Sequence, residues 1–285
     1  MTPYLSIHSC LGFDAEYLRE WVEFHRLVGV ERFFLYNNGD REAQRELLAP
    51  YVEDGIVVLH DFPGLPVQMP AFEHCLANHR EDSRWIAFID TDEFLFSPTG
   101  RPLPEMLAQY EEWPAVGVCR PPFGPSGHRT KPPGLVIESY LTRIAPEQPR
   151  GGALAVKSVI DPRRAVRPFN PHVFELTGGP LVDEQQRPVN KGQVDPPVFE
   201  TLRINHYWTR SEEECRLKFS RIRPDNGEPY VATRNVEGMV ALEHAHGVRD
   251  ETILPHVAPL RERLAETQGR YGFPDSRFEP SLAAD

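Results

Sequence analysis

Four short apolar runs in the first third of the chain have the length of buried strands, at residues 3–10, 31–38, 55–62 and 85–90. Three segments of helical character separate them, at residues 11–29, 41–50 and 67–80. In the first of these, Leu18, Trp21 and Val22 recur at helical spacing, and Gly29 ends the pattern. Strands and helices that alternate in this way predict an α/β fold, in which helices cover both faces of a largely parallel sheet.

The pattern changes after residue 92. Strand-like runs joined by loops rich in Pro and Gly follow, at residues 116–123, 135–143, 153–162, 172–177 and 201–208. A helix is expected over 211–222, because Ser211 followed three residues later by Glu214 has the form of a capping box. The second half is therefore expected to be mixed sheet with few helices. We expect one domain over residues 1–268 and a polar tail over 269–285.

Composition narrows the class of protein. The 285 residues carry 31 Lys and Arg against 42 Asp and Glu, a net charge of −11, so a nucleic-acid partner is not expected. The four cysteines lie far apart, which argues against a zinc ribbon or a disulfide framework. No apolar run approaches the ~20 residues that span a bilayer. These features predict a cytoplasmic protein without a transmembrane segment.

An acidic cluster follows the fourth apolar run. Asp90 and Asp92 are alternate residues of an extended segment, so their side chains can converge on one point. Such a carboxylate pair suits Mn²⁺ or Mg²⁺, whose remaining positions water and a substrate phosphate can fill. A different interpretation is that Asp90 to Glu93 cap the start of a helix, where acidic side chains are also favoured.

Several motifs in sequence order resemble one family. They are AEYLREWVEFHRLVGVERFFLYNNGD, GIVVLHDF, WIAFIDTDEFLF, FGPSGH, VKSVIDP, PHVF and INHYWTRSEEECRLK, together with Gln68, Ala71 and Cys75. The combination, spread over roughly residues 4–223, is similar to the DUF23-type glycosyltransferases of family 92, a group with the GT-A fold related to family 2. The resemblance implies a mixed central sheet, with a nucleotide-binding half at 1–96 and an acceptor-side half at 97–268.

The resemblance also implies an activity: inverting transfer of a sugar from a nucleotide-sugar donor to a glycan or lipid-linked acceptor. UDP is the expected nucleotide. Asp90 and Asp92 would be the metal-binding pair, and His206 in INHYW a third metal ligand, with His172 and His128 as rivals. An enzyme of this kind would work in the cytoplasm, where it could lie peripherally at the inner face of the membrane.

Other polar residues are candidates for the nucleotide or its diphosphate. The family usually has Lys-Asn-Glu before the first helix, whereas this chain has Gly12-Phe13-Asp14, which keeps only the carboxylate. Lys157 is the one cation in an apolar strand, so a diphosphate or a buried acid is its expected partner. The full set of candidates for donor binding is Asp14, Asn37, Asn38, Gln68, Asp90 and Lys157, with Arg210, Lys218 and Arg221 as further phosphate contacts.

An inverting transfer also needs a base that takes the proton of the acceptor hydroxyl. The candidates are Asp183, Glu184 and Glu138, with Asp195 as a further possibility. Two other functions stay open at this stage. A metal-dependent nucleotidyltransferase could use the same acids, and a catalytically inactive GT-A domain could still bind a carbohydrate or a nucleotide.

Overall fold

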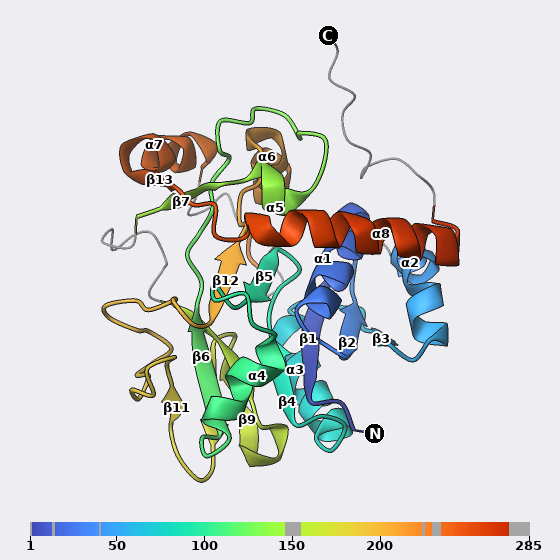
Figure 1. Ribbon diagram of the computed structural model, residues 1–285, viewed down its shortest axis with the longest axis vertical. Coiled ribbons are helices and arrows are strands. Elements are labelled where there is room, and N and C mark those ends of the chain that lie inside the picture. The colour runs from blue at the N-terminus through green and yellow to red at the C-terminus, as the bar shows by residue number, and fades with distance from the viewer. Residues whose placement is uncertain are drawn as a thin grey trace.

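A computed structural model describes residues 2–12, 15–39, 41–145, 155–223, 226–229 and 235–273. Its centre is a seven-stranded sheet of order β11-β6-β8-β4-β1-β2-β3 (Figure 1). The strands are β1 (Leu5–Leu11), β2 (Arg32–Asn37), β3 (Val57–Asp61), β4 (Trp85–Phe88), β6 (Ala115–Cys119), β8 (Val156–Ile160) and β11 (Leu181–Val182). Strands β4, β1, β2 and β3 run parallel, whereas β8 is antiparallel to both β4 and β6. The sheet is therefore mixed, as predicted.

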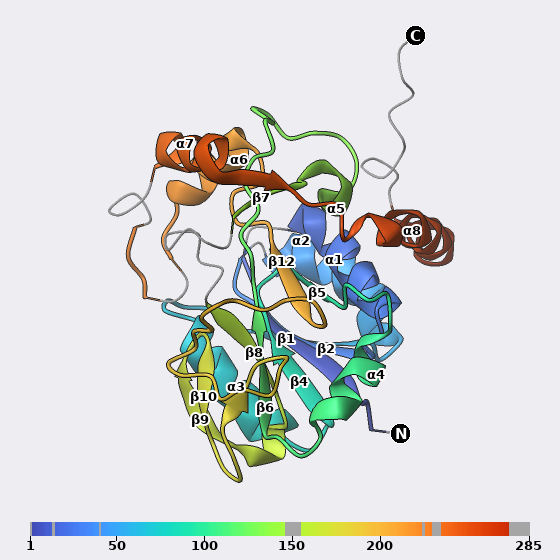
Figure 2. The ribbon, with the colours of Figure 1, turned by 60° about the vertical axis from the view of Figure 1, so that its left-hand side comes forward.

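Helices cover both faces of this sheet (Figure 2). Helix α1 (Ala15–Leu27) and helix α8 (Val257–Tyr271) lie on one face, and helix α3 (Gln68–His79) lies on the other. Alternate residues of β2 account for the two layers: Phe33 packs with the α1 side and Phe34 with the α3 side. The predicted fold class, α/β with a mixed central sheet and helices on both faces, is confirmed and agrees with the GT-A arrangement that the resemblance implied.

The first half follows the sequence pattern closely. Helix α1 ends at Leu27, and Gly29 adopts a positive φ of 107° where a Cβ atom would lie 2.6 Å from Pro104. Helix α2 (Arg41–Glu53) joins β2 to β3. Strand β5 (Glu93–Phe96) follows β4 after a short turn and pairs antiparallel with β12 (Arg203–His206). Because Asp92 is followed by a strand, the interpretation of the acidic cluster as a helix cap is wrong.

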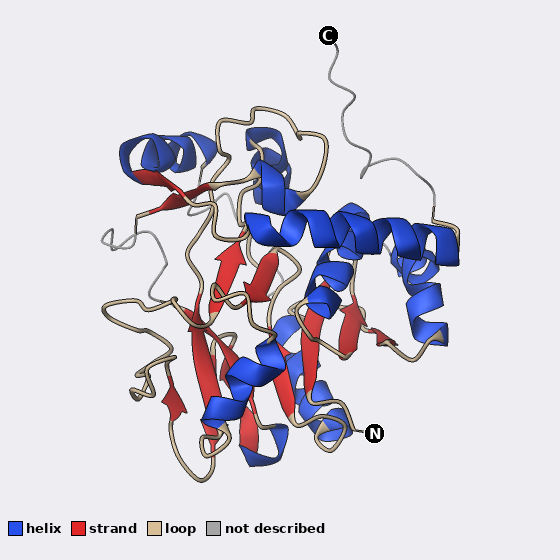
Figure 3. Cartoon of the chain, viewed as in Figure 1, coloured by secondary structure: helices blue, strands red, loops and turns tan. Residues whose placement is uncertain are grey.

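The second half contains more helix than the pattern predicts (Figure 3). Residues 135–143 were expected to form a strand, but they form helix α5 (Val136–Ser139) and the start of strand β7 (Thr142–Ile144). The capping box at Ser211 and Glu214 is confirmed at helix α6 (Glu212–Phe219). The remaining α-helices and strands of the described residues are α4 (Leu103–Leu107), β9 (Ala165–Asn170), β10 (Val173–Leu176), α7 (Val236–His246) and β13 (Gly247–Arg249).

Candidate active site

The acidic cluster opens onto a cleft of about 1290 Å³. One wall comes from the C-terminal edge of the parallel strands and includes Leu11, Asn38 and Asp90. The opposite wall comes from the segment after β12 and from α6 and α7, and includes Trp208 and Lys218. Because loops can approach a ligand at this edge without disturbing the core, it is where open α/β sheets bind ligands.

The turn that carries the acids is held by its own backbone and by α1. The Glu93 amide donates to the Asp90 carbonyl at 3.0 Å, and the Asp90 amide donates to Glu93 Oε2 at 2.9 Å. From α1, Trp21 Nε1 donates to the Glu93 carbonyl at 2.8 Å, and the Leu95 amide donates to His25 Nε2 at 3.0 Å. The helical spacing of Trp21 and His25 thus braces both the turn and strand β5.

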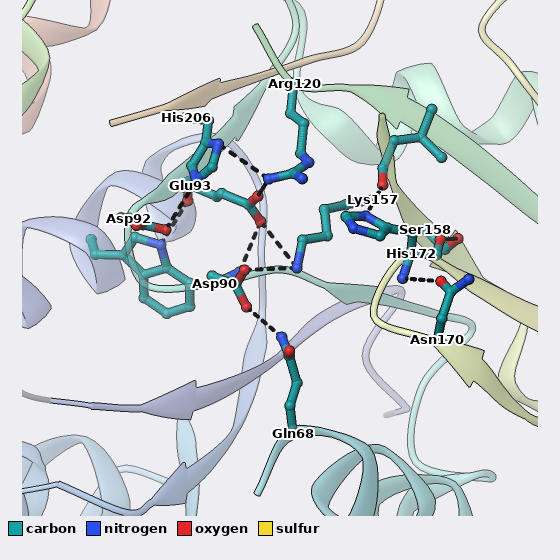
Figure 4. A network of polar contacts seen from close by, with 12 residues as sticks. Gln68, Asp90, Asp92, Glu93, Arg120, Lys157, Ser158, Asn170, His172 and His206 are labelled. Carbon is teal, nitrogen blue, oxygen red and sulfur yellow. Dashed lines mark hydrogen bonds and ion pairs between the residues drawn. The ribbon is translucent and has the colours of Figure 1, made fainter. Parts of the chain in front are cut away.

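Asp90 lies between a cation and an amide (Figure 4). Lys157 Nζ is 2.7 Å from Asp90 Oδ2, and Gln68 Nε2 donates to Asp90 Oδ1 at 2.9 Å. Burial acts to raise the pKa of the Asp90 carboxyl, but Lys157 and Arg120 together outweigh it and the pKa lies below its ordinary value. Asp90 is therefore ionised at neutral pH, with 38% of its side chain still exposed to the cleft.

Glu93 lies behind this pair and is fully buried. Arg120 Nη1 is 3.1 Å from Glu93 Oε1, and Lys157 Nζ is 3.7 Å from Glu93 Oε2. Burial raises the pKa of Glu93 to about 7, although both cations act against it. Glu93 does not line the cleft, so its role is to fix the cations that do.

Asp92 forms an ion pair with a second lysine of the site, Lys218. Lys218 Nζ is 2.6 Å from Asp92 Oδ2, and the Tyr207 amide donates to the Asp92 carbonyl at 2.8 Å. The other carboxylate oxygen, Oδ1, is buried and has no hydrogen-bond partner among the described residues. His206 Nε2 lies 3.6 Å from this oxygen.

His206 is held in one tautomer by Arg120. The guanidinium can only donate, so its contact of 3.1 Å with His206 Nδ1 places the ring proton on Nε2. Burial and the neighbouring Arg120 lower the pKa of His206 well below its ordinary value, so the ring is neutral. In this arrangement His206 presents an N–H toward Asp92. It would have to exchange its tautomer to become the metal ligand that the sequence predicted.

His172 has the opposite tautomer. Its Nδ1 donates to the Val156 carbonyl at 2.8 Å, since a carbonyl can only accept, and this leaves a lone pair on Nε2. The Asn170 side chain accepts from the His172 amide at 2.8 Å, and Ser158 Oγ donates to the His172 carbonyl at 2.6 Å. Burial, with Arg120 and Lys157 nearby, lowers the pKa of His172 to about 4. A neutral, firmly oriented imidazole therefore lines the cleft beside Lys157.

The residues that the sequence offered as a catalytic base do not line the cleft. Asp183 is 2% exposed and binds Arg187 at 2.7 Å. Glu184 accepts three backbone N–H groups, of residues 200, 201 and 202, each at 2.8 Å. Glu138 caps α5 at the Leu135 amide and pairs with Arg261. Asp195 also lies outside the lining.

Three candidates for nucleotide binding remain, Asn38, Asn37 and Asp14. Asn38 lines the cleft, and its amide donates to the carbonyls of Phe62 and Gly64 at 2.8 and 2.9 Å, which holds the loop after β3. Asn37 is fully buried at the end of β2 and does not line the cleft. Asp14 lies outside the described residues. His128, a rival of His206 as a metal ligand, does not line the cleft, and its Nε2 lies 3.0 Å from the Ser139 carbonyl.

The site offers two carboxylates to a divalent metal but lacks a third protein ligand among the described residues. No cluster of three or more His, Cys, Asp or Glu within the described ranges is disposed to hold a metal ion. Two carboxylates are nevertheless enough for Mn²⁺ or Mg²⁺, which complete their coordination with water and phosphate. The unpartnered Oδ1 of Asp92 is a suitable ligand atom beside the ionised Asp90. Asp90 and Asp92 are therefore the residues that would hold a metal here.

Sequence reasoning missed one central residue, Arg120, which binds both Glu93 and His206. Its position directly after the apolar run 115–119 is a signal similar to the one that identified Lys157, which lies within an apolar strand. The lining as a whole is cationic although the chain is acidic, with six Lys or Arg against four Asp or Glu. The cations are Arg120, Lys157, Arg210, Lys218, Arg221 and Arg223, and the acids are Glu16, Asp90, Asp92 and Glu214.

Comparison with solved structures gives partial matches. The crystal structure of S. aureus TarS 1-349 has a TM-score of 0.34 and 8% sequence identity, and covers 56% of this chain and 47% of its own. Glucosyl-3-phosphoglycerate synthase from Mycobacterium tuberculosis has a TM-score of 0.29 and 14% identity, and covers 41% and 44%. None of the described helices is both long and apolar enough to cross a membrane.

Comparison of sequences is more informative. A glycosyltransferase family 92 protein of Oryza sativa subsp. japonica is 29% identical over 90% of this chain and 41% of its own length. A galactan beta-1,4-galactosyltransferase of Arabidopsis thaliana is 32% identical over 75% of this chain and 43% of its own length. The chain thus spans about two fifths of these relatives. The profile of glycosyltransferase family 92 matches residues 9–195, and the chain belongs to this family.

Proposed function

We propose that this member of glycosyltransferase family 92 transfers a sugar from a UDP-sugar to a hydroxyl group of a glycan or lipid-linked acceptor, with Mn²⁺ or Mg²⁺ held by Asp90 and Asp92. The observation that carries the proposal is the pairing of each acid with its own lysine in one cationic cleft. Lys157 accompanies Asp90, and Lys218 accompanies Asp92. A diphosphate with a divalent cation matches this alternation of charge.

The order of strands suggests how the donor would lie. Strands β1, β2 and β3 end beside Gly12, Asn38 and the loop at 62–64, which gives the nucleoside a wall of backbone and amide groups. Strands β4 and β8 follow in the sheet and carry Asp90 and Lys157, where the diphosphate would meet its cations. The sugar would then lie on the side of β8 and His172.

When bound, the metal would supply positive charge that stabilises the departing diphosphate. Lys157 and Arg120 supply fixed charge to the same region because Glu93 anchors both. In the transfer, the acceptor oxygen forms a bond to the anomeric carbon as the bond from that carbon to the phosphate oxygen breaks. The electron pair of the broken bond leaves with the nucleoside diphosphate. Attack opposite the leaving group inverts the anomeric centre.

The acceptor hydroxyl must lose its proton as it attacks. We assign this proton to His172 Nε2, because His172 lines the cleft and its other ring nitrogen is committed to the Val156 carbonyl. The cations Arg120 and Lys157 lower the pKa of His172 in the protein described here. A bound diphosphate would offset part of that effect and make the imidazole a stronger base.

Incubation with UDP-galactose and Mn²⁺ tests the proposal, with galactose chosen because of the relatives named as galactosyltransferases. Release of UDP, by transfer or by slow hydrolysis, supports a glycosyltransferase. Release of pyrophosphate from a nucleoside triphosphate with glucose 1-phosphate would instead indicate a nucleotidyltransferase. Binding of UDP without turnover of any of several UDP-sugars would indicate an inactive nucleotide-binding domain.

A further inference from the structure

The two lysines of the cleft are held in different ways. Lys157 belongs to the central strand β8, its side chain is 2% exposed, and it faces two acids, Asp90 and Glu93. Lys218 belongs to α6, and its side chain is 24% exposed. Its ammonium binds Asp92 Oδ2 at 2.6 Å and the Trp208 carbonyl at 2.9 Å. Lys157 is a fixed part of the core, whereas Lys218 reaches the site from the cleft wall.

Lys218 occupies an oxygen that a metal would need. Asp92 offers two carboxylate oxygens, of which Lys218 holds Oδ2 and Oδ1 has no hydrogen-bond partner in the described part of the chain. An ammonium and a divalent cation on one carboxylate repel each other strongly at such distances. Metal binding at Asp92 must therefore weaken the contact with Lys218, and the lysine in turn lowers the affinity for metal.

The backbone of α6 can stay in place while the lysine moves. The helix is fixed at its start by the Ser211 capping box, and Glu214 accepts from Tyr140 at 2.9 Å. Lys218 is one turn further along from Glu214, and its long side chain places Nζ over the Trp208 ring, 5.7 Å from its centroid. Rotation about its side-chain bonds is enough to bring the ammonium from Asp92 to another anion in the same cleft.

We propose that Lys218 is an internal counter-cation, which neutralises Asp92 in the free protein and transfers to the diphosphate when donor and metal bind. This inference rests on the proposed function, because the diphosphate belongs to the donor. It predicts that metal and nucleotide bind cooperatively. The nucleotide draws Lys218 away from Asp92, which improves the site for metal, and by linkage the metal improves the site for nucleotide by the same factor.

The test compares Lys218→Met with wild type. Methionine keeps an unbranched apolar side chain at this position and removes the charge. Arg216→Met is the matched control, since Arg216 is a cation of the same helix that pairs with Glu212 at 3.1 Å and does not line the cleft. Thermal unfolding confirms that both variants are folded. Mn²⁺ affinity is measured by electron paramagnetic resonance without nucleotide, and UDP affinity by calorimetry with and without Mn²⁺.

We expect Lys218→Met to bind Mn²⁺ alone about fivefold more tightly than wild type, and the gain in UDP affinity caused by Mn²⁺ to fall about fivefold. Arg216→Met should match wild type in both measurements. Unchanged or weaker Mn²⁺ binding by Lys218→Met would overturn the inference. A wild type that binds Mn²⁺ but not UDP would contradict the proposed function instead, while a wild type that binds neither would contradict both.

Discussion

Lys157→Met removes the one ammonium that faces both Asp90 and Glu93. The Asp90 side chain is 38% exposed, so water can take over much of its solvation, but Glu93 is fully buried and loses a cation 3.7 Å away. Removal of one partner from a buried ion pair costs roughly 3–5 kcal/mol. Arg120 remains on Glu93, so we expect the lower end, about 3 kcal/mol of the free energy of unfolding.

The stability lost in Lys157→Met should increase with pH. The pKa of Glu93 is about 7 in the folded protein and about 4.5 in the unfolded chain. The contribution of Glu93 to stability is therefore fully present below pH 4.5, where the carboxyl is protonated in both states, and is lost as the pH rises through 7. Without Lys157 the folded pKa rises further. The difference between wild type and Lys157→Met should therefore be larger at pH 8 than at pH 5.5, where Glu93 is protonated in both proteins.

Urea unfolding of wild type and Lys157→Met at pH 5.5 and 8 measures this difference. Glu93→Gln in the Lys157→Met background should recover part of the stability at pH 8, because an amide carries no charge that needs a cation. Equal stability of wild type and Lys157→Met at pH 8, within about 0.5 kcal/mol, would refute the account of a buried acid supported by its cations.

Three further predictions test other parts of the account. His25→Leu leaves the Leu95 amide without its acceptor at a cost of about 2 kcal/mol in urea unfolding. Because burial lowers the pKa of His25 to about 3, the contribution of His25 to stability falls by about 2 kcal/mol from pH 7 to pH 5, so the variant should lose about 2 kcal/mol less than wild type over this range. Glu184→Ala frees three backbone N–H groups and should lower stability by about 2–3 kcal/mol, yet leave the rate of UDP release at saturating donor unchanged, an outcome that a role as base at the cleft would not give. His172→Asn should slow UDP release about 100-fold at saturating donor with UDP affinity retained, and a rate close to that of wild type would exclude His172 as the base.

The first half of the fold could be predicted because its structure is local. The strands before residue 92 are apolar runs, and α1 has its buried residues at helical spacing, so periodicity alone identifies them. Asp90 and Asp92 were also accessible to sequence reasoning. They follow a buried strand whose C-terminal end must lie at the ligand-binding edge of a parallel sheet.

The parts that sequence reasoning missed depend on distant contacts. Helix α5 forms where a strand was expected because Glu20 of α1 accepts from the amides of Val136 and Ile137 at 3.0 and 3.2 Å, which satisfies the start of the helix from 116 residues away. The roles of the acids in the second half depend on their partners in the same way. Glu184 resembles any exposed loop acid in sequence, and only the fold shows that it is used to hold three backbone amides.

The most direct measurement is a calorimetric titration of wild type and Asp92→Asn with UDP, carried out with and without Mn²⁺. The account predicts that Mn²⁺ strengthens UDP binding by wild type and that Asp92→Asn loses this gain at least tenfold, since the amide cannot replace the carboxylate as a ligand. Thermal unfolding of the variant should remain cooperative and within a few degrees of wild type. An Asp92→Asn protein that binds UDP with Mn²⁺ as tightly as wild type would contradict a metal and diphosphate site at Asp90 and Asp92.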